Sequence, residues 1–140
     1  MRQILLFAAL AASLALLSGC ALSKAKADTA EDMSDKAAYH KLSAEEAYEM
    51  MASQEVVVVD VRTREEYDGG HIENAVLVPN ESIDSEMPEA LPDKEATLLV
   101  YCRSGRRSKD AAQKLLALGY QSVYDFGGVI DWPYELVKEG

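Results

Sequence analysis

The chain has 140 residues, of which 49% are hydrophobic, and this length supports one domain whose core needs no disulfide or metal ion. Its 14 basic and 24 acidic residues give a formal charge of −10 at pH 7. Such an acidic balance argues against binding to nucleic acid and against electrostatic docking on anionic lipid.

The amino terminus has the composition of an export signal. Arg2 precedes an apolar run, residues 4–17, that has the length of a secretory hydrophobic region and is shorter than the roughly 20 residues needed to span a bilayer. The sequence Leu-Ser-Gly-Cys that ends at Cys20 resembles the lipobox of bacterial lipoproteins, in which the cysteine is lipidated and becomes the first mature residue. The resemblance implies a signal peptide over residues 1–19. The alternative is an ordinary cleaved signal whose cysteine is incidental.

Residues 21–38 are small and charged, which is typical of a flexible tether, although a helix is an alternative. We expect residues 20–38 to form a lipidated amino terminus and tether for a domain over residues 39–140. Ala21 does not resemble an inner-membrane retention signal. The expected location is therefore the periplasmic face of the outer membrane, or the outer face of the cell membrane in a one-membrane bacterium.

The rest of the chain alternates short apolar runs with helical patterns. Expected strands are residues 39–42, 56–59, 75–78, 97–101 and 122–126, and expected helices are residues 44–53, 62–70, 81–91, 108–118 and 129–137. Ser43 and Glu46 have the spacing of a capping box. Gly119 is expected to end the fourth helix, and Gly127 with Gly128 to end the last strand. This alternation predicts an α/β fold with a parallel sheet and right-handed crossovers.

The sequence LLVYCRSGRRSKDAA, residues 98–112, predicts a strand, a tight loop and a helix. Amides in the first turn of a helix lack partners and carry the positive end of the helix dipole, so a loop at this position binds anions. At the strand end, Cys102 is expected to have its thiol pKa lowered from about 8.5 toward roughly 3.5–7.5 by such amides. It would then be an ionised nucleophile. Gly105 is expected to have a positive φ, and Ser108 to cap the helix.

Separately, these features have ordinary explanations. A cysteine after a buried strand is more often an inert core residue, and an arginine run is more often a solvated surface. Here, however, Arg103, Arg106 and Arg107 surround the same strand-to-helix junction as Cys102 in an otherwise acidic chain. The coincidence favours a catalytic loop for an anionic substrate.

The sequence CRSGRRS after an apolar strand resembles the active-site loop of the rhodanese family of sulfurtransferases. Two further motifs fit that family: DVRTREEYDGGHIENAVLVP, residues 60–79, and GGVIDW, residues 127–132. The resemblance covers the chain from about residue 39 to about residue 137. It implies a rhodanese-like α/β fold, in which a central five-stranded parallel sheet is flanked by helices on both faces.

The resemblance also implies a reaction. A thiosulfate-like donor would deliver its sulfane sulfur to Cys102, and a thiol or cyanide would then remove it from the resulting persulfide. Such a covalent intermediate gives ping-pong kinetics. No cofactor or metal is implied, and the expected form is a monomer whose only other partner is the membrane. The loop residues expected to bind substrate are Arg103, Ser104, Gly105, Arg106 and Arg107.

Other charged residues near the expected strands have structural interpretations. We expect Asp60 and Arg62 to brace a strand end, and Glu66 to have a structural role as well. His71 is expected to hydrogen-bond the backbone, because with Glu73 it supplies only two potential metal ligands. Trp132 is expected in the core or in a pocket wall.

Two rival functions remain. Phosphatases and arsenate reductases of the same fold resemble a pattern with an arginine six positions after the cysteine, whereas this chain has Ser108 there and an arginine at Arg107. The shorter loop favours sulfur transfer. The second rival is a non-catalytic sulfur-carrying or binding module, whose usual mark is loss of the cysteine, and Cys102 is present.

Overall fold

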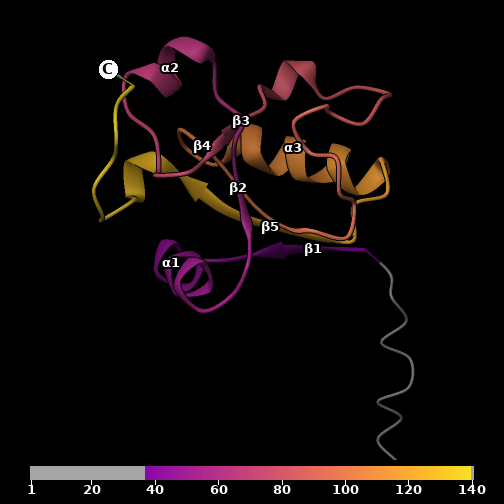
Figure 1. Ribbon diagram of the computed structural model, residues 1–140, viewed down its shortest axis with the longest axis horizontal. Helices are drawn as coiled ribbons and strands as arrows, with labels where there is room; N and C mark the ends of the chain where they lie inside the picture. Colours follow the sequence, from indigo (N-terminus) through magenta and orange to yellow (C-terminus); the bar gives the residue numbers. More distant parts are fainter. Residues whose placement is uncertain (1–36, 140) are drawn as a thin grey trace, which may run out of the picture. The chain divides into compact units, whose positions relative to one another are not determined.

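The computed structural model of the protein describes residues 37–139, so the expected signal peptide, Cys20 and the tether up to residue 36 lie outside the described residues. One parallel sheet of five strands has the order β1-β5-β4-β2-β3 (Figure 1). The strands are β1 (Ala38–Lys41), β2 (Val57–Asp60), β3 (Val76–Leu77), β4 (Thr97–Cys102) and β5 (Ser122–Gly128). All five expected strands and the expected α/β class are confirmed.

The helices are α1 (Ala44–Ser53), α2 (Arg64–Asp68) and α3 (Arg106–Ala117), with single 3₁₀ turns η1 (Asn80–Ser82) and η2 (Val129–Asp131). A capping box begins α1, where the Ser43 hydroxyl accepts from the Glu46 amide and the Glu46 carboxylate accepts from the Ser43 amide. Thr63 and Glu66 form the same box before α2. No helix within residues 37–139 is long and apolar enough to cross a membrane.

Strand β4 separates the two halves of the hydrophobic core. Side chains alternate along a strand, so Leu98, Val100 and Cys102 enter one buried cluster, while Leu99 and Tyr101 enter the other. The first cluster packs against α3 and the second against α1 and α2, and α1 and α3 lie on opposite sides of the sheet (Figure 1). Helices on both faces are therefore confirmed, and Cys102 lies on the α3 side.

Two expected helices are wrong. Residues 81–91 contain only the end of η1, and the rest of the segment is irregular. Its side chains Ile83 and Leu91 are buried in the core, each with 2% of its surface exposed. Residues 129–137 form η2 and then an extended end, whose Val137 pairs with His71. Proline restricts the residue before it and cannot sit inside a helix, and both segments contain one, Pro88 and Pro133 respectively.

Two expected boundaries around the loop are also wrong. Helix α3 begins at Arg106, because Gly105 in a left-handed conformation (φ 98°) precedes its first turn, and Ser108 is therefore inside the helix. The positive φ expected of Gly105 is confirmed. Gly119, which has a φ of 96°, follows the end of α3 as expected. Strand β5 continues through Gly127 and Gly128 instead of ending before them. Trp132 packs against the second core cluster, as expected.

Candidate active site

Cys102 lies at the carboxyl end of β4, between β2 and β5 in the sheet. Ligand sites of open parallel α/β sheets form at this edge, because the loops that leave the strands meet there. Residues 103–105 form the loop that follows, and α3 begins directly after it. Only 1% of the Cys102 surface is exposed, so a substrate must present a small terminal atom to reach the sulfur.

The sulfur of Cys102 accepts a hydrogen bond from the backbone amide of Gly105, at 3.0 Å between Sγ and N. Burial raises the pKa of the Cys102 thiol, but hydrogen bonds from Ser108 and from the amides of Gly105 and Ser104 outweigh that effect. The pKa is therefore lowered, in the direction that the sequence predicts. The loop therefore favours the anionic form of the sulfur although the residue is buried.

The glycine pair at the end of β5 makes room for this loop. A Cβ atom at Gly128 would collide with the backbone oxygen of Arg103 and would lie 2.6 Å from the Cα of Ser104. Gly127 has a φ of 90°, and its Cα would be 3.4 Å from a Cβ at Gly105. The loop and β5 thus pack backbone against backbone. The two glycines were expected to end the strand. Their position is instead explained by this close backbone contact, which leaves no room for side chains.

Ser108 lies beneath the loop and is fully buried. Its Oγ is 2.7 Å from Oδ1 of Asp125, and 3.1 Å and 3.3 Å from the carbonyl oxygens of Gly105 and Gly127. Asp125 is also fully buried, and the sequence analysis missed it. One signal was available, because Asp125 is the only charged residue in the apolar strand run VYDF.

The three arginines of the loop region have different environments. Arg107 makes a bidentate ion pair with Glu66 of α2, with N–O distances of 2.7 Å and 2.8 Å. The hydrogen bonds from Arg107 lower the pKa of the Glu66 carboxyl to about 2. Arg103 and Arg106 are exposed, and their guanidinium groups make no hydrogen bond or ion pair with other residues in 37–139. Arg107 therefore joins α3 to α2, whereas Arg103 and Arg106 are available to a ligand.

A polar cleft of about 660 Å³ lies against the outer side of the loop. Arginine, serine and asparagine side chains line it together with two carboxylates. Its lining residues are Asn80, Glu81, Arg103, Ser104, Arg106, Arg107 and Asp110. Every loop residue expected to bind substrate except Gly105 therefore faces this cleft, and Gly105 contacts the sulfur from within the loop.

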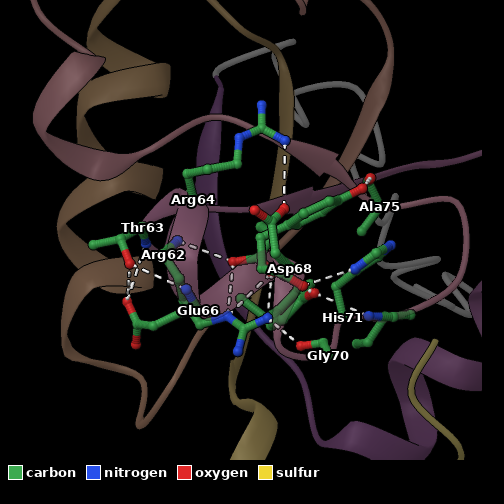
Figure 2. Close-up of polar contacts among 12 residues, drawn as sticks. Arg62, Thr63, Arg64, Glu66, Asp68, Gly70, His71 and Ala75 are labelled. Carbon is green, nitrogen blue, oxygen red and sulfur yellow. Dashed lines mark hydrogen bonds and ion pairs between the residues drawn. The ribbon is translucent and has the colours of Figure 1, made fainter. Parts of the chain in front are cut away.

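A buried ionic brace supports the β4 end from the other face of the sheet. Asp60 accepts from Arg62 at 2.6 Å and from the Tyr101 hydroxyl at 2.7 Å, and Tyr101 directly precedes Cys102. Arg62 also donates to the carbonyl of Gly70, and the ring of His71 hydrogen-bonds a backbone carbonyl of α2 (Figure 2). The structural interpretations of Asp60, Arg62 and His71 are confirmed. Within residues 37–139, no three His, Cys, Asp or Glu side chains are grouped to hold a metal ion.

Comparisons with known proteins agree with this geometry. A family model described as a rhodanese-like domain matches residues 43–133. A rhodanese from E. coli aligns with a TM-score of 0.55 and 34% identity, over 61% of this chain and 100% of that one. The human single-domain sulfurtransferase TSTD1 aligns with a TM-score of 0.59 and 27% identity, over 66% of this chain and 93% of that one.

One group of curated relatives is much longer. The tRNA uridine(34) hydroxylase of Yersinia pestis (strain Pestoides F) is 32% identical over 106 residues, which is 72% of this chain. The match covers 30% of that protein, so the chain spans less than a third of its relative's length.

Gly128→Ala tests the packing of the loop on β5. The added methyl group overlaps backbone atoms that cannot rotate away, which should cost at least about 1 kcal/mol and lower the Tm by about 5 °C or more. Displacing the loop should also raise the pKa of Cys102. Thermal unfolding followed by circular dichroism, and alkylation of the thiol against pH, measure the two effects.

Gly69→Ala is the matched control for this substitution. Gly69 has an ordinary helical φ of −68°, and a Cβ there would meet the Glu65 carbonyl oxygen at 3.4 Å. This variant should keep both the Tm and the Cys102 pKa of the parent protein. Equal behaviour of the two alanine variants would contradict the role assigned to Gly128.

Proposed function

Because the chain belongs to the family of rhodanese-like domains, we propose that it transfers sulfane sulfur through a persulfide on Cys102. The observation that carries this proposal is the hydrogen bonding of the Cys102 sulfur, which lowers the thiol pKa although the residue is buried. A thiolate is the reactive form of cysteine. The likeness to a human single-domain sulfurtransferase supports the same assignment.

The proposed reaction has two balanced steps. In the first, the Cys102 thiolate attacks the outer sulfur of thiosulfate, a Sγ–S bond forms, and the S–S bond of the donor breaks with its electron pair leaving on sulfite. In the second, cyanide or a thiolate attacks the terminal sulfur of the persulfide, and the electron pair of the Sγ–S bond returns to Cys102. No external oxidant or reductant takes part, and a ping-pong rate law follows.

The loop would assist both steps electrostatically. Its amide groups and the amino terminus of α3 would stabilise the negative charge of the thiolate and of the persulfide, because both anions would be surrounded by the same amide groups. Arg103 and Arg106 would orient the sulfonate end of the donor in the cleft. Arg107 would contribute mainly by holding α3 against Glu66. The narrow access to Cys102 favours donors that end in a single sulfur atom.

The rival functions receive less support. A phosphatase needs its loop arginine to face the oxyanion, but Arg107 is one position early and is paired with Glu66. A module that only binds a partner needs no thiolate, so the lowered pKa of Cys102 favours a domain that carries or transfers sulfur. The hydroxylase acts on tRNA according to its name, whereas the charge of −10 on this chain argues against a nucleic-acid substrate.

We also propose that the domain is attached to the cell envelope through a lipidated Cys20. Support comes from the apolar run over residues 4–17 and the Leu-Ser-Gly-Cys sequence that follows it. Lipidation of Cys20 would leave Cys102 as the only free thiol, since the chain has two cysteines. The active site would then have no partner in its own chain with which to form a disulfide.

The persulfide is the most direct test of the reaction. Thiosulfate should add one sulfur atom, about 32 Da, to the protein, because the thiolate is the acceptor. Cys102→Ser should show neither the added mass nor any formation of thiocyanate from cyanide. Mass spectrometry of the intact protein and a colorimetric thiocyanate assay measure these outcomes.

Cys20→Ala is the matched control, because it removes the other cysteine and should still form the persulfide. An unchanged mass with thiosulfate and other sulfane donors would refute the proposed sulfur transfer. Rapid release of phosphate from aryl phosphates would instead establish the phosphatase alternative.

The anchor has its own test. Expressed with its complete amino terminus in a bacterium, the protein should enter the detergent phase and carry a lipid on Cys20, because two acyl chains each contribute about 0.8 kcal/mol per buried CH₂. Cys20→Ala should carry no lipid at residue 20. A wild-type protein that is fully aqueous and begins after residue 20 would contradict the proposed anchor.

A further inference from the structure

A second cavity, of about 300 Å³, shares no lining residue with the active-site cleft. It is formed by α1, by residues that precede β3 and by the segment that follows η2. Its lining includes three aromatic rings and two carboxylates, and no basic side chain. The rings belong to Tyr48, Trp132 and Tyr134, and the carboxylates to Glu73 and Glu135. The proposed sulfur transfer makes no use of this cavity.

The three rings form two walls at a steep angle to each other. Tyr48 and Tyr134 stack, with ring centroids 3.9 Å apart and ring planes inclined by 17°. The indole of Trp132 stands across this pair, at 5.0 Å and 71° from Tyr134 and at 6.1 Å and 62° from Tyr48. Both tyrosines are partly exposed, with 45% of the surface of Tyr48 and 37% of that of Tyr134 accessible. The rings therefore border the cavity and do not only fill the core.

Tryptophan is a costly side chain for the wall of this cavity unless its ring has a further use. The Nε1–H group of Trp132 is buried and has no hydrogen-bond acceptor within residues 37–139. A buried donor without a partner lowers stability, and a phenylalanine ring would pack without that cost. The indole, however, attracts a cation over its face more strongly than the other aromatic rings do. Trp132 therefore suits a positively charged ligand.

The charges around the cavity have one sign. Glu73 and Glu135 are exposed, and neither side chain makes an ion pair within residues 37–139. Such carboxylates attract cations and repel anions, and the formal charge of −10 on the chain acts in the same direction. The active-site cleft differs, because three arginines line it. The cleft and this cavity therefore favour ligands of opposite charge.

We propose that this cavity binds a small quaternary ammonium compound such as choline. The methylated ammonium group would lie against the indole of Trp132 and the stacked tyrosines, where its charge gains cation–π attraction and its methyl groups gain apolar contact. Glu73 and Glu135 would add Coulombic attraction without a hydrogen bond, which a quaternary ammonium group has no proton to donate. A primary ammonium group is more strongly hydrated, so aromatic rings replace its water less well.

Trp132 is the only tryptophan of the chain, so its fluorescence reports on this cavity. Choline chloride should change the fluorescence of the full-length Cys20→Ala protein until it saturates, whereas sodium chloride at the same ionic strength should not. Dimethylbutanol, the neutral carbon isostere of choline, should bind at least about tenfold more weakly, because it lacks the charge. Isothermal titration calorimetry measures the same affinities without relying on the indole.

Phosphocholine distinguishes a free cation from a lipid headgroup as the ligand. It carries the same trimethylammonium group together with a phosphate, which Glu73 and Glu135 would repel. Phosphocholine should therefore bind more weakly than choline. Tighter binding of phosphocholine would overturn the assignment to a free cation and would favour a lipid headgroup.

Variants of the cavity wall locate the binding. Tyr134→Leu should weaken choline binding about tenfold, because it removes one ring, and Tyr134→Phe should retain most of the affinity, because it keeps the π face. Glu135→Gln should weaken binding about threefold, as expected for an exposed charge. Glu49→Gln is the matched control, since Glu49 is an exposed carboxylate next to Tyr48 on α1 but does not line the cavity. This control should bind choline as the parent does.

The inference is overturned if neither fluorescence nor calorimetry detects choline, or if dimethylbutanol binds as tightly as choline does. It is also overturned if Tyr134→Leu and Glu49→Gln bind choline alike. Thermal unfolding of each variant shows whether the fold is retained, and the partly exposed Tyr134 can be replaced without opening the core. None of these measurements requires a persulfide on Cys102, so failure of the sulfur-transfer proposal would be seen separately.

Discussion

Burial and hydrogen bonding act in opposite directions on the thiol of Cys102. Desolvation alone would raise its pKa, and the amides of the loop together with Ser108 reverse that effect. Amide groups can do this only while they point at the sulfur, which requires a fixed backbone and a left-handed Gly105. The reactivity of the site therefore depends on the conformation of three loop residues, and much of the surrounding structure restrains that conformation.

The restraints come from every side of the loop. Gly127 and Gly128 let β5 pack directly against it, and the Arg107–Glu66 ion pair fixes the first turn of α3 to α2. From the opposite face of the sheet, the Asp60–Arg62 brace holds Tyr101 and thus the residue next to Cys102. Breaking one partner of such a buried pair leaves an uncompensated charge, so the brace strongly favours a single position of the strand end. Beneath the loop, the buried hydroxyl of Ser108 lies 2.7 Å from the buried carboxylate of Asp125.

Features encoded within a few residues were predictable from the sequence. The capping box of Ser43 and Glu46, the positive φ of Gly105 and the strand ending at Cys102 each follow from local patterns. The resemblance of three motifs to the rhodanese family predicted the fold, which the family model over residues 43–133 confirms. The prolines that prevent two of the expected helices, Pro88 and Pro133, are visible in the sequence as well. Scattered apolar residues do not distinguish a loose helix from an irregular packed segment, which is what the structure has over residues 83–91.

Contacts between distant segments were not predictable in this way. Arg107 and Glu66 are 41 residues apart in sequence, and only the packing of α2 beside α3 brings them together. The arginine therefore looked like a substrate ligand when its main partner is a carboxylate. Asp125 and Tyr39 are 86 residues apart in sequence, and only the sheet order, which places β1 beside β5, brings them into contact.

We infer that folding of the loop, and not the local sequence, stabilises the anionic form of the Cys102 sulfur. The most direct measurement is the pKa of this thiol in the folded Cys20→Ala protein and in the same protein unfolded in urea, both followed by thiolate absorbance. We expect a folded-state pKa clearly below the unperturbed value of about 8.5 and a return to about 8.5 on unfolding. Equal values in the two states, or a higher value in the folded protein, would contradict the claim.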